Sequence, residues 1–85
     1  MKSFAVVFTY SFDCDSSVYL FDTQDEAIKF MTESYKEELR IDKEENEWST
    51  EGYMAKDKMY AKIVNHFADG DDVTEFHVAN VYAQY

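Results

Sequence analysis

The sequence has one cysteine, no proline and only two glycines, and each shortage excludes a class of protein. A single thiol at Cys14 cannot form an internal disulfide, and one cysteine cannot supply the ligands of a structural zinc site. A disulfide-stabilised secreted domain is therefore excluded, and a reducing compartment such as the cytoplasm is expected. With no proline, and glycine only at Gly52 and Gly70, the chain contains no flexible linker or low-complexity tract.

Long hydrophobic runs and basic residues are also scarce. No segment approaches the ~20 apolar residues of a transmembrane helix, and the residues after Lys2 lack the apolar core of a signal peptide. Eight Lys and Arg residues stand against eighteen Asp and Glu, which gives a formal charge of −10. Because phosphate groups are contacted mainly by Lys and Arg, direct binding to nucleic acid or to an anionic membrane is not expected.

For a protein this acidic, the chain is rich in aromatic residues. Hydrophobic side chains make up 46% of the 85 residues and aromatic side chains 18%, unlike a disordered acidic tail. Each large apolar side chain contributes ~1.5–3 kcal/mol when it is buried. We therefore expect one folded domain over residues 1–85, built around a single core between two layers.

The first half of the sequence predicts a β-hairpin followed by an α-helix. Residues 3–12 alternate between two uncharged sets, as in a central strand, and residues 17–21 form its partner after a turn at 13–16. Thr23 and Glu26 have the spacing of a capping box, which predicts that a helix starts there and ends near residue 41, before the acidic segment 42–47. Its predicted buried stripe is Ala27, Phe30, Met31, Ser34, Tyr35 and Leu39.

The second half predicts two or three further strands. Residues 48–56 are ambiguous, with a short strand around Tyr53 and a bulge at Gly52, whereas residues 59–67 and 72–82 form longer strands. Asp69-Gly70 is the strongest hairpin signal, and a two-residue turn there would pair Phe67 with Asp72. The resulting order β-β-α-β-β-β predicts an α+β two-layer sandwich, in which an antiparallel sheet of four to five strands carries one helix on one face.

Three short clusters resemble reactive or metal-binding motifs, but each lacks the other residues that such chemistry needs. Asp13-Cys14-Asp15 has the spacing of an aspartate-nucleophile phosphatase, yet 85 residues cannot supply the parallel sheet and distant residues of that fold. The three aspartates around Gly70 lack the further oxygen ligands of a calcium loop. His66 and His77 have no third ligand and are not neighbours in the predicted register. We expect no catalytic residue, no metal site and no cofactor.

The acidity is concentrated in one part of the sequence. Between Asp13 and Glu51 there are thirteen carboxylates and four basic residues, a formal charge of −9, whereas the rest of the chain sums to −1. A surface of one charge attracts basic partners and repels nucleic acid. We predict an acidic partner-binding face on the helix and the loop after it, formed by Glu33, Glu37, Glu38, Glu44, Glu45, Glu47 and Trp48.

Two parts of this prediction have plainer alternatives. Trp48, beside Glu44, Glu45 and Glu47, is interpreted either as an aromatic hot spot within a charged rim or as a core residue that closes the helix end. The carboxylates themselves are interpreted either as a binding face or as a solvated surface that keeps a small protein soluble.

Self-association is the main alternative function. The face of the last two strands that points away from the helix mixes apolar and polar side chains, and such open faces often mark interfaces. We predict a homodimer contact through Tyr60, Val64, Val73 and Val81. The function favoured overall is a small, cytosolic, non-enzymatic protein–protein interaction domain, in one form a nucleic-acid mimic that inhibits a basic protein partner. An enzyme acting on a small ligand or through a metal is the third and least favoured interpretation.

Short segments of the chain carry a resemblance. They are Ala5-Val6-Val7-Phe8-Thr9-Tyr10, Glu51-Gly52-Tyr53, and Asn65-His66-Phe67 with Gly70-Asp71-Asp72. With these segments the chain resembles a group of small acidic bacterial proteins of unassigned function, which implies no activity. In size and charge it is also similar to the nucleic-acid mimics of phages and mobile elements, among them anti-CRISPR and anti-restriction proteins. This similarity concerns surface charge, so it implies a basic partner and assigns no residue.

Overall fold

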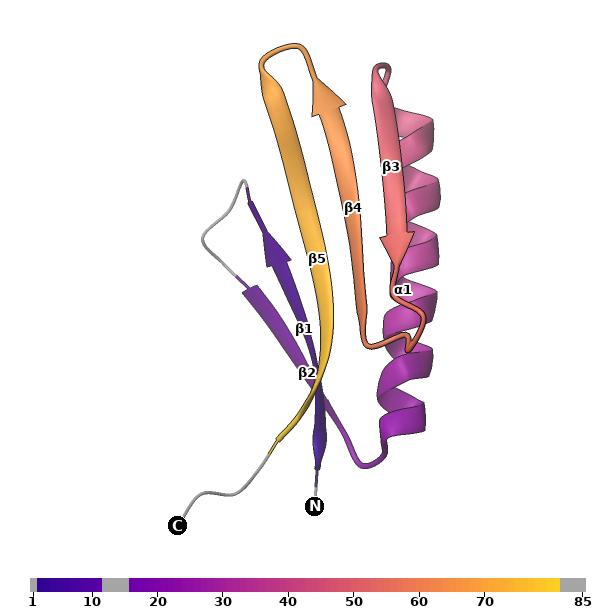
Figure 1. Cartoon of the computed structure of the whole chain (residues 1–85), viewed down its shortest axis with the longest axis vertical. Coiled ribbons are helices and arrows are strands. Elements are labelled where there is room, and N and C mark those ends of the chain that lie inside the picture. The colour runs from indigo at the N-terminus through magenta and orange to yellow at the C-terminus, as the bar shows by residue number, and fades with distance from the viewer. Residues whose placement is uncertain (1, 12–15, 82–85) are drawn as a thin grey trace.

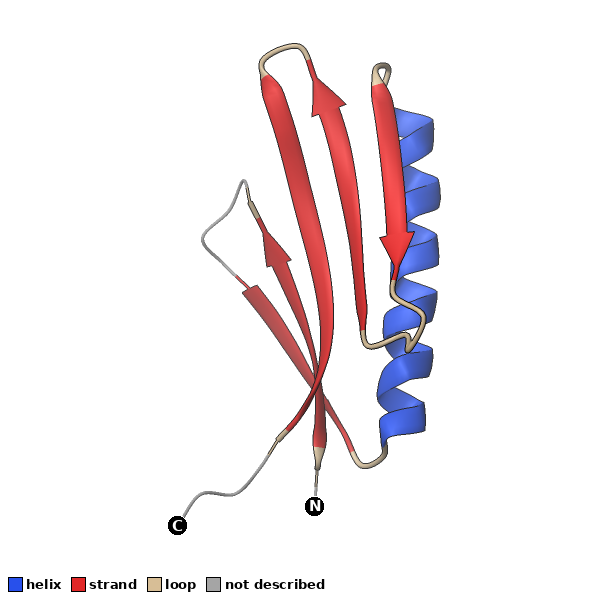
Figure 2. Ribbon diagram, viewed as in Figure 1, coloured by secondary structure: helices blue, strands red, loops and turns tan. Residues whose placement is uncertain are grey.

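A computed structural model describes residues 2–11 and 16–81 of the chain. Five antiparallel strands form one sheet, and a single helix packs on one face of it, as the sequence predicts (Figures 1 and 2). The strand order is β2-β1-β5-β4-β3, so the first and last strands of the chain are neighbours inside the sheet. The elements are β1 (Phe4–Tyr10), β2 (Ser16–Phe21), α1 (Gln24–Glu45), β3 (Ser49–Met54), β4 (Tyr60–Phe67) and β5 (Gly70–Asn80).

The core lies between α1 and the sheet. Strand residues of even number in β1 and β5 face the helix, because side chains alternate between the two faces of a strand. Buried residues from both layers meet there: Val6, Ala27, Met31, Tyr35, Ala61, Ile63, Phe76 and Val78. Of the predicted helix stripe, Ala27, Met31 and Tyr35 are buried, whereas Phe30 and Leu39 are partly buried and pack against this cluster.

The helix starts as predicted and ends later than predicted. Thr23 Oγ1 accepts a hydrogen bond from the Glu26 backbone N–H (3.2 Å) and donates one to the Glu26 carboxylate (3.0 Å). The expected end near residue 41 is wrong, because the helix continues to Glu45. Carboxylates near a helix C-terminus oppose its dipole, but here Arg40 pairs with Glu37 and Glu44 (2.6 and 3.1 Å) and offsets part of that repulsion.

The predicted register of the β4–β5 hairpin is wrong by two residues. Phe67 pairs with Gly70 rather than with Asp72, so the turn is formed by Ala68 and Asp69. A type I′ turn at Asp69-Gly70 would need positive φ at both residues. In the described chain Lys58, in the β3–β4 turn, is the only non-glycine with positive φ, whereas Gly70 has φ 144°. Because side chains alternate with a period of two, this slip leaves every residue on the predicted face.

Gly52 lies within a continuous strand, so the expected bulge is absent. It pairs with Ile63 in an uninterrupted β3–β4 ladder. A Cβ at this position would collide with Tyr35 Oη and would lie 2.8 Å from Leu39 Cδ2. A side chain at position 52 would therefore force Tyr35 and Leu39 of the helix to shift.

Candidate functional site: an acidic pole

The C-terminal end of α1 and the β4–β5 turn lie at the same end of the molecule. Ser49, the first residue of β3, pairs with His66 near the end of β4, and His66 pairs with Asp71 at the start of β5. Figure 1 shows the start of β3, the end of α1 and the β4–β5 turn together at the top. We call the carboxylates gathered there the acidic pole: Asp42, Glu44, Glu45, Glu47, Glu51, Asp69, Asp71 and Asp72.

Two acidic clusters that are about 25 residues apart in the sequence thus form one surface. A shallow depression lined by Asp42, Glu45, Asn46, Asn65 and Phe67 connects the helix end to the end of β4. Only the pairing of the strands brings the turn aspartates beside the helix acids. The sequence interpretation treated Asp69, Asp71 and Asp72 as an isolated turn and so did not include them in the site.

The predicted acidic face is divided by the helix into separate groups. Glu37 and Glu44 share Arg40, and this guanidinium lowers the pKa of Glu37. Glu38 lies on the flank of the helix near Asp42. Its pKa is raised by partial burial, and the neighbouring carboxylates Asp42, Glu45 and Glu37 raise it further. Only part of the predicted face, namely Glu44, Glu45, Glu47 and Trp48, belongs to the end of the molecule that holds the acidic pole.

Trp48 is exposed in the loop between α1 and β3. Its exposed fraction is 67%, the highest among the exposed large hydrophobic residues of the described chain. Its backbone N–H donates a hydrogen bond to Asn46 Oδ1 (2.9 Å), which fixes the loop but leaves the indole ring in solvent. The alternative that Trp48 closes the core at the helix end is therefore wrong.

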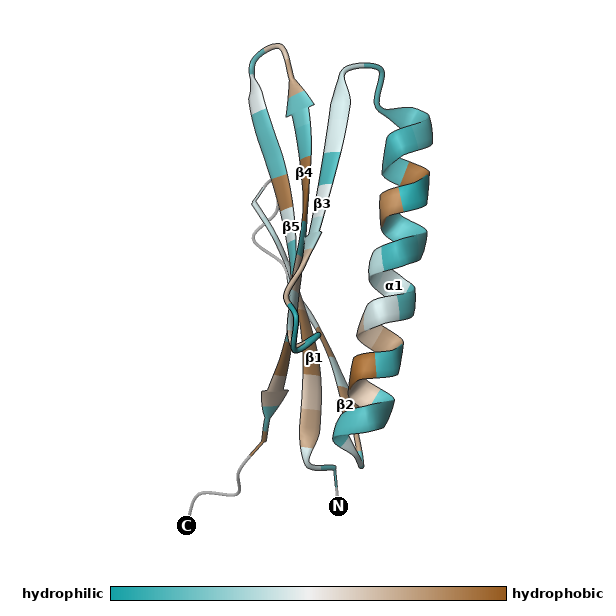
Figure 3. Cartoon of the chain, turned by 45° about the vertical axis from the view of Figure 1, so that its right-hand side comes forward, coloured by the Kyte–Doolittle hydropathy of each residue, from teal (hydrophilic) through white to brown (hydrophobic). Residues whose placement is uncertain are grey.

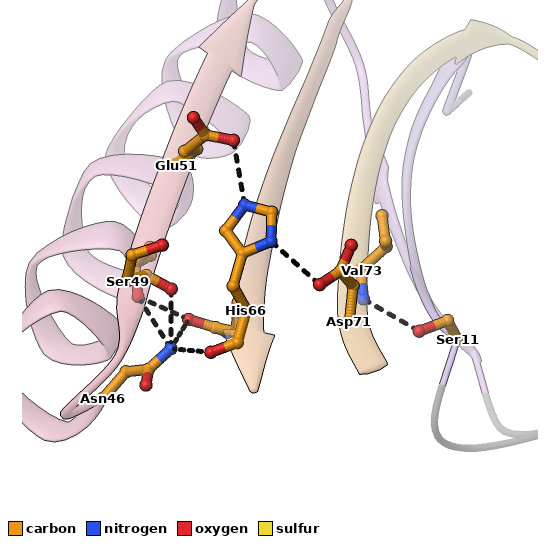
Figure 4. Close-up of polar contacts among 9 residues, drawn as sticks. Ser11, Asn46, Ser49, Glu51, His66, Asp71 and Val73 are labelled. Atoms are coloured by element: carbon orange, nitrogen blue, oxygen red, sulfur yellow. Dashed lines mark hydrogen bonds and ion pairs between the residues drawn. The ribbon is translucent and has the colours of Figure 1, made fainter. Parts of the chain in front are cut away.

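A network of polar side chains anchors the acidic pole to the sheet. Thr50 Oγ1 donates to Asn65 Oδ1 (2.7 Å), and Asn65 Nδ2 donates to Asp42 Oδ2 (3.0 Å). Asn46 Nδ2 donates to the backbone carbonyls of Ser49 (2.8 Å) and His66 (3.3 Å), as Figure 4 shows. These contacts join the last turn of α1 to β3 and β4, and they give a second reason why the helix extends to Glu45.

His66 lies on the open face of the sheet between two carboxylates of the acidic pole (Figure 4). Its Nε2 is 2.9 Å from Glu51 Oε2, and its Nδ1 is 2.8 Å from Asp71 Oδ1. A carboxylate only accepts hydrogen bonds, so the ring makes both bonds at once only when it is protonated. The two bonds raise the pKa of His66. In this state neither ring nitrogen is available as a base or as a metal ligand.

The predicted self-association residues lie on the open face of the sheet. Val64 and Val73 pair across β4 and β5, whereas the Tyr60 hydroxyl donates to Glu75 (2.7 Å), which raises the pKa of Tyr60 to about 12. Val81 follows β5 and is 43% exposed. Sequence reasoning missed Val18 and Leu20 of β2, which are 56% and 51% exposed and share this face. Their alternation with Tyr19 was the available signal.

Comparisons with known proteins give no relative. No protein family matches the chain, and neither a curated protein nor a solved structure shows significant similarity to it. Within residues 2–11 and 16–81, no helix is long and apolar enough to cross a membrane. No group of three or more His, Cys, Asp or Glu in the same residues could hold a metal ion. The Asp13-Cys14-Asp15 cluster lies outside the described residues.

Proposed function

We propose that this protein is a small non-enzymatic interaction domain whose acidic pole binds a basic protein. The observation that carries the proposal is the convergence of two acidic segments, 42–51 and 69–72, at one end of the fold. A concentrated field of one sign accelerates association with an oppositely charged surface and repels nucleic acid. Proteins that handle DNA or RNA present such basic surfaces, so the proposed activity is inhibition of a nucleic-acid-binding protein by mimicry, in the cytoplasm.

The orientation of α1 adds to this field. The helix C-terminus carries the negative end of the helix dipole, equivalent to about half an elementary charge. It ends at Glu45, inside the acidic pole. The C-terminal end of the helix dipole and the carboxylates therefore present negative charge at the same end of the molecule, as a nucleic-acid backbone would.

Trp48 is the proposed anchor of the contact. Interface energy concentrates in a few aromatic or Arg side chains surrounded by polar residues. Trp48 is exposed and is next in sequence to Glu47. Burial of its indole ring against the partner would supply apolar contact area that charge alone does not, while the surrounding carboxylates would select a basic surface.

The test compares capture of basic proteins by three forms of the protein. The first is the parent, the second neutralises the pole with Glu44→Gln, Glu47→Gln and Asp69→Asn, and the third is a control with Asp22→Asn, Asp25→Asn and Asp57→Asn. Both variants remove three negative charges, but only the first set lies at the acidic pole. Each form is immobilised and exposed to host lysate at low and moderate salt, and captured proteins are identified by mass spectrometry.

We expect the parent and the control variant to retain the same basic, nucleic-acid-binding protein, and the pole variant to lose it. Binding should weaken steeply with salt, and duplex DNA or RNA should compete for the captured partner. If the pole variant captures that protein as well as the parent does, the acidic pole is not the binding surface. If nucleic acid does not displace the captured protein, the proposed mimicry is wrong, although the charged acidic pole would still be the binding surface.

The second candidate function is self-association through the open face of the sheet. It is favoured by the exposure of Val18, Leu20 and Val81 on a face that no other layer of the described chain covers. Two copies of an acidic chain repel each other, so a homodimer should strengthen as salt rises, opposite to binding of a basic partner. Light scattering against concentration at two salt levels, with Leu20→Lys as the disrupting variant, separates the two functions.

A further inference from the structure

A cavity of about 160 Å³ lies between α1 and the neighbouring strands β1 and β5. Three aromatic side chains line it: Phe8, Tyr10 and Phe76. The helix contributes Ser34 and the carboxylates of Glu37 and Glu38, and β5 contributes Thr74. The cavity therefore has aromatic walls and an acidic side, and none of its described lining residues is Lys or Arg.

The aromatic walls are held in place by the core. Phe8 and Phe76 meet edge to face, with ring centroids 4.8 Å apart. Phe8 also stacks on Phe30, with centroids 6.0 Å apart and nearly parallel rings, and Phe76 packs edge to face on Tyr35. Phe76 is only 2% exposed, so the core packs around its ring. The aromatic wall of the cavity is therefore held by core packing, whereas the two glutamates line it from the surface of the helix.

The two carboxylates of the cavity differ in their charge partners. Glu37 is bonded to Arg40 at 2.6 Å, so its charge is already compensated. Glu38 is partly desolvated, and the charged groups that act on it, Asp42, Glu45 and Glu37, are all acidic. A cation placed in the cavity would relieve this repulsion, whereas an anion would increase it.

We propose that this cavity binds a small organic cation with an alkylated ammonium head group. Aromatic rings attract such cations through the ring quadrupole, and the partly buried Glu38 carboxylate adds a charge of the required sign. The volume is appropriate, because a protein cavity of about 150 Å³ holds a molecule the size of benzene, and a trimethylammonium group is no larger. None of the lining residues belongs to the acidic pole, although Asp42 and Glu45 of the pole act on Glu38. The proposal does not depend on the function proposed for the pole.

The experiment compares two ligands of the same shape and different charge. Choline carries a trimethylammonium group, and 3,3-dimethyl-1-butanol is its neutral isostere with a tert-butyl group. Each is titrated into the ¹⁵N-labelled protein at constant ionic strength, and backbone shifts of Phe8, Tyr10, Thr74 and Phe76 are followed by NMR. We expect saturable choline binding with a dissociation constant on the order of 1 mM, and binding of the isostere roughly tenfold weaker.

Two matched variants test whether the carboxylate of Glu38 binds the cation. Glu38→Gln keeps the shape of the side chain and should reduce choline affinity roughly tenfold, so that the two ligands bind alike. Asp25→Asn removes the same charge from the other end of the same helix and should leave choline binding unchanged. Equal affinity of choline and its isostere for the parent would overturn the proposal and identify a plain apolar pocket.

Two other outcomes would also overturn it. If sodium chloride reproduces the choline shifts at equal ionic strength, the cation belongs to the diffuse counterion atmosphere of an acidic protein and not to this cavity. If choline produces no saturable shift at Phe8, Tyr10, Thr74 and Phe76, the cavity does not take alkylated ammonium groups.

Discussion

The two ends of this molecule are built from the same two layers but are held together by different interactions. The end opposite the acidic pole carries four lysines and four acids, and we call it the neutral pole: Lys2, Lys29, Lys56, Lys58, Asp22, Asp25, Glu26 and Asp57. Beside it lie the buried residues Ala27 and Met31 of α1. Along α1, all of which the structure describes, no residue after Tyr35 is buried. The acidic half is anchored by the partly buried Leu39 and by hydrogen bonds from Asn46, Thr50 and Asn65.

Figure 3 shows the same division in hydropathy. Hydrophobic colouring gathers in the lower half of the sheet near the chain ends, whereas the last turn of α1 and much of the upper part of β4 and β5 are hydrophilic, with brown bands at the tip of β4 and lower on α1. Because the apolar packing is concentrated at one end, it does not depend on the charged side chains at the surface of the other end. Glu44, Glu47 and Asp69 take no part in the hydrogen bonds of Asn46, Thr50 and Asn65 described above, so they can be neutralised with little loss of stability. The charge variants proposed above therefore test binding rather than folding.

The largest expected effect comes from removing apolar packing beside the neutral pole. Met31 is fully buried in the core cluster. Met31→Ala should lower the free energy of unfolding by about 2–5 kcal/mol, because it removes transfer energy and leaves a cavity. Urea denaturation measures the loss. Val18→Ala, at an exposed site, should change stability by less than about 0.5 kcal/mol. Equal losses in the two variants would show that Met31 does not lie in the core.

The next largest effect comes from breaking the network of polar side chains that anchors the acidic pole to the sheet. Asn65 accepts from Thr50 and donates to Asp42 across three elements. Asn65→Ala should cost about 1–3 kcal/mol, since it leaves partly buried polar groups without their partner. Hydrogen exchange should accelerate at the end of α1 and the start of β3 but not around Met31. Exchange that rises uniformly along the chain would contradict separate anchoring of the two ends.

Much of the fold could be predicted from the sequence because its signals are local. The alternation in β1 and the capping box at Thr23 each fix an element from neighbouring residues. With the strand patterns at 59–67 and 72–82, they predict the helix and four of the five strands, whereas β3 lies in the segment that the sequence left ambiguous. The helix end could not be predicted in this way. Locally, the acids after Ile41 oppose a helix, and the Arg40 pairs offset only part of that repulsion. The contact of Asp42 with Asn65, more than twenty residues away in the sequence, adds to the stability of the last turns.

The candidate site was predictable only in part, for the same reason. Charge counting identified Glu44, Glu45, Glu47 and Trp48, which are close together in the sequence. It could not join Asp69 to them, since that requires the antiparallel order β3-β4-β5. Nor could it decide whether Trp48 is buried, because both a core and a surface position fit a tryptophan at a helix end.

A smaller effect is pH-dependent and belongs to the acidic pole. The bonds to Glu51 and Asp71 raise the pKa of His66 above its ordinary value of 6.5. A group with a raised folded-state pKa stabilises the fold fully below its unfolded pKa, and this contribution is lost as pH rises through the folded pKa. The urea midpoint of the parent should therefore fall between about pH 6 and pH 8, and His66→Gln should remove that fall. His77→Gln is the control and should retain it.

The smallest expected effect is a gain in stability rather than a loss. It tests whether the negative charge of Glu38, which has no basic partner among the groups that act on it, destabilises the fold. Partial burial and the neighbouring carboxylates raise the pKa of Glu38, so folding favours its protonated form. The ionised form consequently destabilises the fold above that raised pKa, and the cost disappears as pH falls through it. Glu38→Gln should raise the free energy of unfolding at pH 7, by less than about 1 kcal/mol because the group is largely solvated, and should have no effect at about pH 4. Glu44→Gln removes an equal charge but also the bond to Arg40, so it should not raise the free energy of unfolding. A gain of the same size in both variants would mean that total charge, rather than the environment of Glu38, sets the cost.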